Sequence, residues 1–336
     1  MTPGRGNMNG QRRIGCTLLA LFILGSADAM GQERAETQAF PRQTIKIIVP
    51  FAPGGAPDIV ARVLAQRASE DFKRQVVVEN RTGAGGNIAM EAGAHAAPDG
   101  YTILMCTFGC ATNIFLYDKL TWDPVKDLAP LMMAGIVPNV LVVNTTVPAK
   151  SVKEFIALAR KRPGLLTMAS SGVGSASHLA GEMFKKMAGI SVVHVPYRGS
   201  TAALPDIIGG QVDSMIVSIP DALGFIKSGV LRALGTSGTQ RASSLSDVPT
   251  IAESGLPHYA VSAWSALFVP SGTPQTIVMR LNSAFNKALD NPETRKRLAD
   301  LSVEPVGGPP SRAGDYLKAQ MADWGKLIRE QGIRAN

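Results

Sequence analysis

One glycine-rich turn carries residue types that could do covalent chemistry. The segment 172–178 reads GVGSASH and brings His178 close behind Ser175. A serine beside a histidine can act as nucleophile and base in a hydrolase. The sequence holds only 4 histidines, however, and neither G-x-S-x-G nor H-E-x-x-H, so the common hydrolase and metalloprotease arrangements are absent. A structural role for His178, beside the turn or in a cleft, is therefore favoured over a catalytic one.

The same segment also resembles a dinucleotide-binding turn. It follows a predicted strand, opens a predicted helix and matches G-x-G-x-x-G except that Ser177 stands for the third glycine. An NAD site would need an acidic residue near the end of the next strand, where this chain has Tyr197 and Arg198, although an arginine could hold a 2′-phosphate. The match is weak and no P-loop motif occurs, so we expect no cofactor.

Small, glycine-rich turns recur between strands and helices. They occupy residues 52–58, 83–87 and 171–175. Such turns expose main-chain N–H groups at the positive end of a helix dipole, where anions bind. Three or four charge-assisted hydrogen bonds, roughly 1.5–3 kcal/mol each, can support a micromolar complex after the costs of association. A carboxylate is the expected guest, and its binding requires no enzymatic step.

The N-terminus has the organisation of a secretory signal. Arginines precede an apolar run at 14–25, and Ala27 and Ala29 form an A-x-A cleavage site. The run is too short for a membrane span. We therefore predict a signal peptide at 1–29, a flexible leader at 30–43, and a soluble mature chain in the periplasm.

Composition and periodicity favour a two-lobed α/β protein. The chain has 336 residues, of which 45% are hydrophobic and 18% charged, and its 34 glycines and 22 prolines indicate many tight turns. Short apolar strands alternate with helical patterns. We assign 44–140 to the first part of lobe 1, 141–236 to lobe 2, and 237–336 to a return crossover and the second part of lobe 1. Two crossovers between the lobes would form a hinge.

The net charge and the cysteines indicate which ligands, metals and macromolecular partners to expect. The formal charge is +8, and the chain stays basic after processing, which assists encounter with anions. No motif supports nucleic-acid binding. Cys106 and Cys110 could form a local disulfide or be two small half-buried residues, and both alternatives stay open. Zinc is not expected, because no second cysteine or histidine pair lies nearby, and we predict no other metal.

Several longer motifs occur in a fixed order along residues 40–332. They are IVPFAPGG with Asp58, ENR followed by GAGGN, APDGYT, SSGVGSASH, HVPYRG, GGQVD and DVPTIAE. With these motifs the chain resembles the periplasmic solute receptors of tripartite tricarboxylate transporters, also called Bug receptors.

The resemblance implies a type II periplasmic-binding-protein fold, in which each lobe is a mostly parallel sheet flanked by helices. It implies a ligand cleft between the lobes and a solute carboxylate held by main-chain N–H groups and water. Asp58 is expected to cap its helix and hold the turn rather than touch the anion. The predicted ligand-binding residues are Pro53, Gly54, Gly55, Ala56, Asp58, Thr107, Phe108, Thr112, Ser170, Ser171, Gly172, Ser175, His178, Arg198 and Gly199.

Two departures from the family pattern bear on the solute. Pro57 stands where many relatives have Thr or Ser, which removes a hydroxyl and an N–H donor. The third loop, 107–113, carries Phe108 and Cys110 where polar contacts are common, which favours an apolar or aromatic acid. Arg198 either pairs with a second carboxylate of a diacid or is a solvated surface charge.

The predicted function is a monomeric periplasmic receptor, not an enzyme. It captures a small carboxylate by hinge closure and delivers it to the permease subunits of a tripartite tricarboxylate transporter. Two alternatives remain at this level: an exported hydrolase-like enzyme that uses Ser175 and His178, and a ligand-sensing partner of a membrane kinase. The sequence identifies neither the carboxylate nor the permease.

Overall fold

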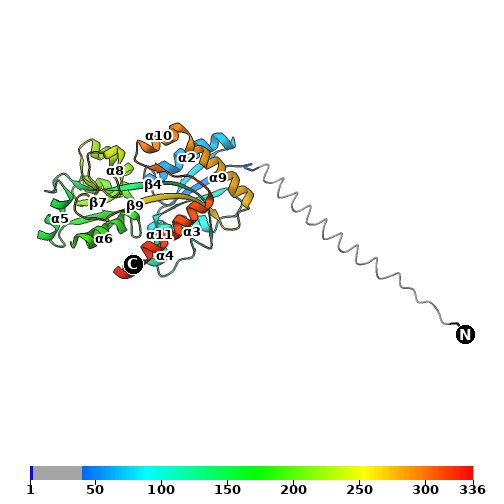
Figure 1. Cartoon of the computed structure of the whole chain (residues 1–336), viewed down its shortest axis with the longest axis horizontal. Helices are drawn as coiled ribbons and strands as arrows, with labels where there is room; N and C mark the ends of the chain where they lie inside the picture. The colour runs from blue at the N-terminus through cyan, green and yellow to red at the C-terminus, as the bar shows by residue number, and fades with distance from the viewer. Residues whose placement is uncertain (3–39, 336) are drawn as a thin grey trace. The chain divides into compact units, whose positions relative to one another are not determined.

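The computed structural model describes residues 1–2 and 40–335. The apolar run of the predicted signal peptide and most of the predicted leader lie outside the described residues. Every described helix and strand lies in one compact unit, Gln43–Asn336 (Figure 1). None of the described helices has both the length and the apolar character needed to cross a membrane.

Short buried strands alternate with helices along this unit, as the apolar runs predict. In chain order the elements are β1 (Ile45–Val49), α2 (Ala56–Phe72), β2 (Val76–Asn80), η1 (Ala84–Gly86), α3 (Asn87–Ala94), β3 (Thr102–Thr107), α4 (Phe108–Leu116), β4 (Leu128–Asn144), α5 (Val152–Lys161), β5 (Thr167–Ser170), α6 (Ala176–Ala188), β6 (Val193–Pro196), α7 (Ser200–Ile208), β7 (Ser214–Ser218), α8 (Ile219–Lys227), β8 (Leu231–Thr236), η2 (Ser243–Leu245), β9 (Ser262–Pro270), α9 (Gln275–Asp290), α10 (Pro292–Ala299), β10 (Glu304–Pro305) and α11 (Pro310–Gln331).

One ten-stranded sheet runs through the unit in the order β2-β1-β3-β9-β4-β7-β5-β6, with β8 and β10 also paired to β4. The long strand β4 pairs antiparallel with β9 along 128–138 and with β7 along 139–143. The outer strands are parallel: β1 pairs with β2 and β3, and β5 pairs with β6 and β7. Strand β4 therefore belongs to both halves of the sheet.

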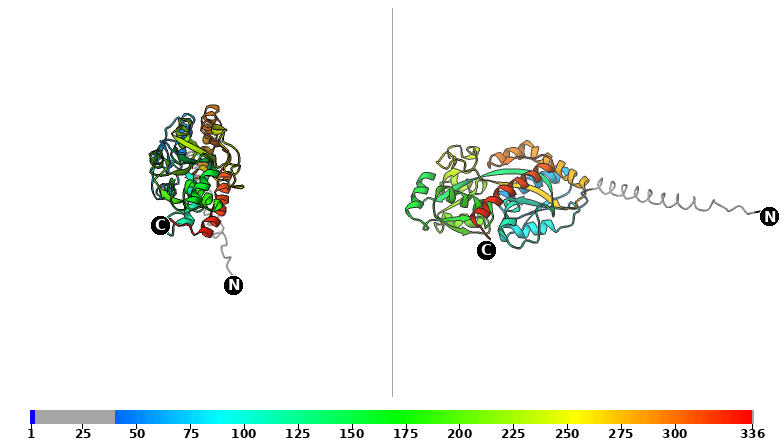
Figure 2. Two further views of the ribbon diagram at one scale, coloured as in Figure 1. Left: turned by 90° about the vertical axis from the view of Figure 1, so that its left-hand side faces the viewer. Right: turned by 60° about the horizontal axis from the view of Figure 1, so that its bottom comes forward.

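Two lobes are built on the two halves of β4. Lobe 1 holds β1 to β3, β9 and β10 with helices α2 to α4 and α9 to α11, and lobe 2 holds β5 to β8 with α5 to α8. Figure 1 and the right view of Figure 2 show the green helices of lobe 2 apart from the blue and orange helices of lobe 1, while the C-terminal end of the red helix α11 reaches the green helices. The predicted two-lobed α/β fold is confirmed. Each lobe has a mixed sheet, because β4 and β9 run antiparallel to their neighbours.

Helix α5 illustrates how local sequence produces a buried face. The Ser151 hydroxyl accepts a hydrogen bond from the N–H of Glu154 at 3.2 Å, which caps the first turn. Phe155 and Ala159 then lie one turn apart on the buried face. The ring of Phe155 packs against Phe184 of α6 with ring centroids 6.2 Å apart. Burying one such ring contributes about 2–3 kcal/mol to stability.

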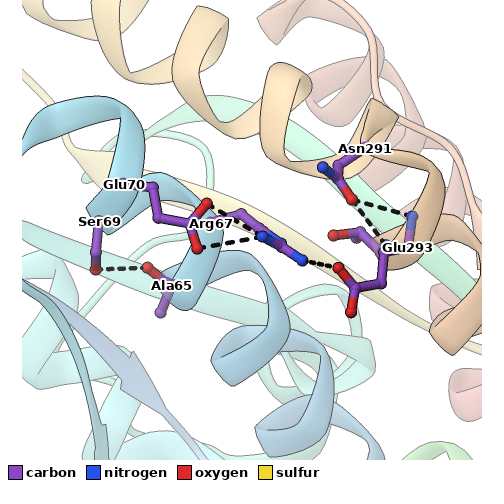
Figure 3. Close-up of polar contacts among 7 residues, drawn as sticks. Ala65, Arg67, Ser69, Glu70, Asn291 and Glu293 are labelled. Carbon is purple, nitrogen blue, oxygen red and sulfur yellow. Dashed lines mark hydrogen bonds and ion pairs between the residues drawn. The ribbon is translucent and has the colours of Figure 1, made fainter.

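On the surface of lobe 1, polar contacts join α2 to α10 (Figure 3). The guanidinium of Arg67 pairs with Glu70 on its own helix, at 3.2 Å, and also with Glu293 of α10. The Asn291 side chain caps α10 by accepting from the N–H groups of Glu293 and Thr294 at 3.0 and 3.2 Å. Both glutamates are exposed, so each ion pair contributes only about 0–1 kcal/mol.

Two expectations about local structure are wrong. The segment after Thr107 is not a loop but the helix α4, which the sequence pattern hides because nearly all of its side chains are buried and no polar face marks it. The strand expected at 141–143 is only the end of β4. Pro130 and Pro138 suggest breaks in this strand, but a register shift beside Pro130 lets the ladder continue.

Candidate functional site

A cleft of about 60 Å³ lies between the lobes, where residues of both come together. Its lining is apolar or hydroxyl-bearing, with a single acidic exception. The lining residues are Phe51, Ala52, Gly55, Ala56, Pro57, Thr107, Phe108, Val137, Ser171, Ser175, Ala176, Ser177, Gly199, Ser200, Thr201, Ser218, Asp221, Ala263, Trp264 and Ser265.

Five helices begin at this cleft. The residues that precede the first helical turn are Gly55 for α2, Thr107 for α4, Ser175 for α6, Gly199 for α7 and Ser218 for α8, and all of them line the cavity. The start of a helix carries about half a positive charge and exposes N–H groups that lack partners in the helix. The cleft therefore has a positive field although no basic side chain is among its described lining residues.

A second groove, of about 990 Å³, is much larger and lies elsewhere on the unit. It is lined by Pro138, Tyr316 and Trp324 among others, and none of the five helix starts contributes to it. We take the smaller cleft as the site, because small solutes bind where polar groups converge in an enclosed space.

The first turn is held by Asp58, which is 2% exposed. Its Oδ2 accepts from the N–H of Gly54 and from Nε of Arg62, both at 2.9 Å, and its Oδ1 accepts from Nδ2 of Asn80 at 2.9 Å. Burial by itself would raise the pKa of Asp58, but these hydrogen bonds outweigh it and hold the pKa below its usual value. Asp58 does not line the cleft, and its contacts hold the turn.

A second aspartate, Asp221 near the start of α8, was not predicted and lies in the cleft. Its Oδ1 accepts from the N–H of Ala56 at 2.7 Å, and its Oδ2 accepts from the hydroxyl of Ser200 at 2.5 Å. Burial raises the pKa of Asp221 to about 6, although both hydrogen bonds oppose the rise. A lobe 2 carboxylate is thus bound to the first N–H of a lobe 1 helix.

Two buried donors in the lining have no partner among the described residues. They are the hydroxyl of Thr107, a residue 3% exposed, and Nε1 of Trp264, a residue 1% exposed. An unpaired buried polar group costs about 1–3 kcal/mol, so an acceptor that reached either donor would stabilise the protein. Next to Thr107, a disulfide joins Cys106 to Cys110 and links the end of β3 to α4.

The predicted turn of lobe 2 contributes Ser171 and Ser175 to the lining. The Ser175 hydroxyl donates to the carbonyl of Gly172 at 2.6 Å and accepts from the main-chain N–H of His178 at 3.2 Å. It caps α6, and its partner in His178 is the main chain rather than the imidazole. The hydrogen bond that a serine nucleophile donates to a basic ring nitrogen is not formed, because the Ser175 hydroxyl donates to Gly172 instead.

His178 lies behind the cleft lining and is 6% exposed. Its Nδ1 accepts from the N–H of Gly174 at 3.2 Å, and its ring stacks on His194 at 4.2 Å. Burial lowers the pKa of His178 to about 3, so the ring is neutral at neutral pH. Its Nε2 is 3.7 Å from a carboxylate oxygen of Glu182.

His178, Glu182 and His194 bring ligand-type atoms within 4.8 Å of one another. The Glu182 carboxylate already binds the ammonium of Lys185 at 2.6 Å, and Nε2 of His194 is bonded to the Ser170 hydroxyl at 2.6 Å. A metal ion would have to displace both partners, so we assign no metal to this cluster.

Of the predicted binding residues, the structure brings seven to the cleft and leaves eight outside its lining. The seven are Gly55, Ala56, Thr107, Phe108, Ser171, Ser175 and Gly199. The eight are Pro53, Gly54, Asp58, Thr112, Ser170, Gly172, His178 and Arg198. Thr112 instead donates to the carbonyl of Gly174 at 2.9 Å and so joins the two lobes, while Arg198 is exposed.

The sequence does not predict Ser200, Ser218, Trp264 or Asp221 as residues of this cleft. One signal was present for Asp221, because Ser218 and Asp221 have the S-x-x-D spacing of a helix start. The Ser218 side chain makes no capping hydrogen bond, however, and Asp221 binds the start of a different helix.

Comparisons with known proteins agree with this geometry. The model of the tripartite tricarboxylate transporter family receptor (TctC) matches residues 60–333. BugT of Bordetella pertussis is 35% identical over 94% of this chain and 98% of its own. The adipate complex of Rpa4515 from R. palustris is 36% identical, covering 88% of this chain and 99% of that one, with a TM-score of 0.85. The malate complex of MatC from Rhodopseudomonas palustris is 32% identical, covering 86% and 100%, with a TM-score of 0.80. The chain therefore belongs to the tripartite tricarboxylate transporter receptor family, the Bug family of solute-binding proteins.

Proposed function

We propose that this chain is a periplasmic receptor that captures a small carboxylate by closure of its two lobes and delivers it to a transporter permease. The observation that carries the proposal is the convergence of five helix starts on one cleft whose described lining has no lysine, arginine or histidine. Such a cleft binds an anion by main-chain N–H groups and helix dipoles. The adipate and malate complexes of similar proteins support a carboxylate as that anion.

Binding without chemistry is supported by the contacts of the candidate catalytic groups. Ser175 is used as a helix cap and His178 accepts a main-chain hydrogen bond. By contrast, the hydroxyl of Thr107 and the indole N–H of Trp264 are donors without partners, as a solute carboxylate requires.

Lobe closure is supported by the few segments that connect the lobes. Strand β4 passes between them, and the chain returns before β9. At this crossing the N–H of Asn139 donates to the Ser237 hydroxyl at 2.9 Å, and the N–H of Val261 donates to the Ser237 carbonyl at 3.0 Å. We propose a hinge here, with lobe 1 formed by 44–140 and 237–336 and lobe 2 by 141–236.

Location and partners complete the proposal. We infer export by the signal peptide at 1–29, a periplasmic monomer, a permease of the tripartite type as partner, and no role for nucleic acid. An uptake assay tests delivery: cells should accumulate the radiolabelled solute only when both the receptor and its permease are produced.

Binding is tested by thermal shift with residues 30–336 and a panel of carboxylates. A ligand at 100 times its Kd stabilises the folded state by about 2.7 kcal/mol, so the melting temperature should rise by several degrees for one class of acid. A panel of mono-, di- and tricarboxylates, amino acids and aromatic acids without any shift would contradict the proposal.

Substitution Gly55→Val tests the position of the site. A Cβ on Gly55 would lie 3.6 Å from the Ala52 carbonyl oxygen and 3.8 Å from the Ser200 hydroxyl, so the fold accepts it, while the larger side chain fills the cleft. Affinity for the solute should fall at least a hundredfold. Gly224→Val is the matched control, because a Cβ there has no neighbour within 4 Å, and its affinity should be unchanged. Equal affinity of the two variants would show that the solute binds elsewhere.

A further inference from the structure

The described residues that line the cleft include a single ionisable side chain, that of Asp221. It is half-buried, because it faces the cavity while protein surrounds its other sides. A carboxylate at the centre of an anion-binding cleft is unexpected, since it repels the very group that the cleft should attract.

The hydrogen bonds of the Asp221 carboxylate explain how the cleft accommodates this group. Its two oxygens accept from Ala56 at the start of α2 and from Ser200 at the start of α7, while Asp221 itself lies in the first turn of α8. It therefore occupies the point where three helix starts meet and takes up part of their positive field. Asp221 thus accepts the hydrogen bonds from Ala56 and Ser200 that a solute carboxylate could otherwise accept there.

None of the described residues that line the cleft is a cation that could offset the charge of Asp221, and Arg198, two residues before Ser200, is exposed and lies outside the lining. On α2, Arg62 is bound to Asp58 at 2.9 Å. On α7, Asp206 accepts from the Tyr197 hydroxyl at 2.6 Å and adds no positive charge.

The other elements packed against α8 add none either. Lys227 lies at the far end of α8 and is exposed, and Arg232 of β8 donates to the carbonyls of Val147 and Ala149. Strands β4 and β7 carry no ionisable residue. A second negative charge brought into the cleft would therefore meet the first without a basic side chain of the described lining to compensate it.

We propose that Asp221 determines which solute this receptor takes: a monocarboxylate that also carries a hydrogen-bond donor, a hydroxyl or an ammonium group, in preference to a dicarboxylate. The proposal rests on the proposed function and names its substrate class. Each oxygen of Asp221 keeps a lone pair for a donor of the solute. The solute carboxylate finds donors in the unpartnered Thr107 hydroxyl and Trp264 indole of the same cleft. A dicarboxylate instead puts its second anion beside Asp221, and a plain alkyl acid leaves Asp221 without a donor.

The test uses straight-chain acids that differ at one end only. One end is a carboxylate, and the other is a methyl, hydroxyl, ammonium or second carboxylate group, joined by two, three or four methylenes. Calorimetry at pH 7.5 gives the Kd of each acid for the wild-type protein and for Asp221→Asn. In the wild type, the hydroxyl or the ammonium member should bind at least tenfold more tightly than both the methyl and the dicarboxylate members of the same length. In Asp221→Asn, the advantage over the dicarboxylate should shrink at least tenfold.

The outcomes separate this proposal from the proposed function. A dicarboxylate that binds most tightly to the wild type overturns the proposal and leaves the carboxylate receptor standing. A preference that Asp221→Asn leaves intact overturns the role of Asp221. Absence of binding by every acid overturns the proposed function, and this inference with it. If Asp221→Asn does not fold, Asp221→Ser replaces it, and the wild-type preference alone already decides between the solute classes.

Discussion

Replacing Asp221 by asparagine should stabilise the protein, and the gain should depend on pH. Because burial raises the pKa of Asp221 from 3.8 to about 6, the folded state binds this proton more tightly than the unfolded state does. The Asp221 contribution to stability is therefore complete below pH 4 and is lost as the pH rises through 6. The difference between 3.8 and about 6 corresponds to up to about 3 kcal/mol, and contact with water in the cleft reduces this figure.

Thermal melting of the wild type and of Asp221→Asn between pH 4 and pH 8 measures this effect. Buried His178 acts in the opposite direction: its pKa is lowered from 6.5 to about 3, so the stability it contributes at neutral pH is lost as the pH falls. The difference between the two proteins cancels this contribution, because both contain His178. For a chain of this size, 3 kcal/mol corresponds to roughly 5 °C, so the variant should gain up to that amount over the wild type between pH 4 and pH 8.

A difference in melting temperature that stays constant over this pH range would refute the argument, because it would mean that Asp221 titrates alike in the folded and unfolded states. Asp247→Asn is the control, since Asp247 is exposed and lies outside the cleft. Its melting curve should follow that of the wild type at every pH.

Three further variants test single features. Thr107→Val should weaken solute binding about tenfold while stability stays equal or rises by about 1 kcal/mol, because it removes an unpaired buried hydroxyl; calorimetry and urea unfolding measure the two effects. His178→Ala should lower the free energy of unfolding by about 2 kcal/mol, since it leaves the Gly174 N–H unpaired. Mass spectrometry should recover the solute unaltered after incubation with the wild type or the variant, and any turnover would restore the enzyme hypothesis. Cys110→Ser should lower the free energy of unfolding in urea by about 2 kcal/mol, because the unfolded chain loses the constraint of a short closed loop. Treating the wild type with a reductant should lower its free energy of unfolding by the same amount.

Local sequence motifs predict where the glycine-rich turns lie. Which residues of these turns line the cleft depends on how distant segments of the chain pack together. Gly55 and Ala56 lie in the cleft as expected, because a strand followed by a glycine turn and a helix start has much the same geometry in any α/β lobe. Gly54 and Asp58 lie outside the lining, because the side chain of Asp58 bonds back to the N–H of Gly54 and holds the turn.

The features that the sequence does not predict depend on contacts between distant segments. Asp221 reaches Ala56 across 165 positions of the chain, and no local pattern reports such a pairing. Strand β4 was recognised only at its end, because its two prolines resemble breaks until the register shift is known. Thr112, a predicted ligand-binding residue, donates to the carbonyl of Gly174 in the other lobe, a contact that no local pattern indicates.

Pro57 and Asp221 both reduce the number of N–H groups that the first turn offers to a solute carboxylate. Pro57 has no N–H, and the N–H of Ala56 donates to Asp221, so two consecutive positions at the start of α2 offer nothing to a solute carboxylate in this structure. The resemblance to Bug receptors implied a solute carboxylate held at this turn. Here the buried side-chain donors of the described lining that have no partner are Thr107, at the start of α4, and Trp264, on β9. Capture of the carboxylate should therefore depend more on Thr107 than on the first turn, while Asp221 receives the opposite end of the solute.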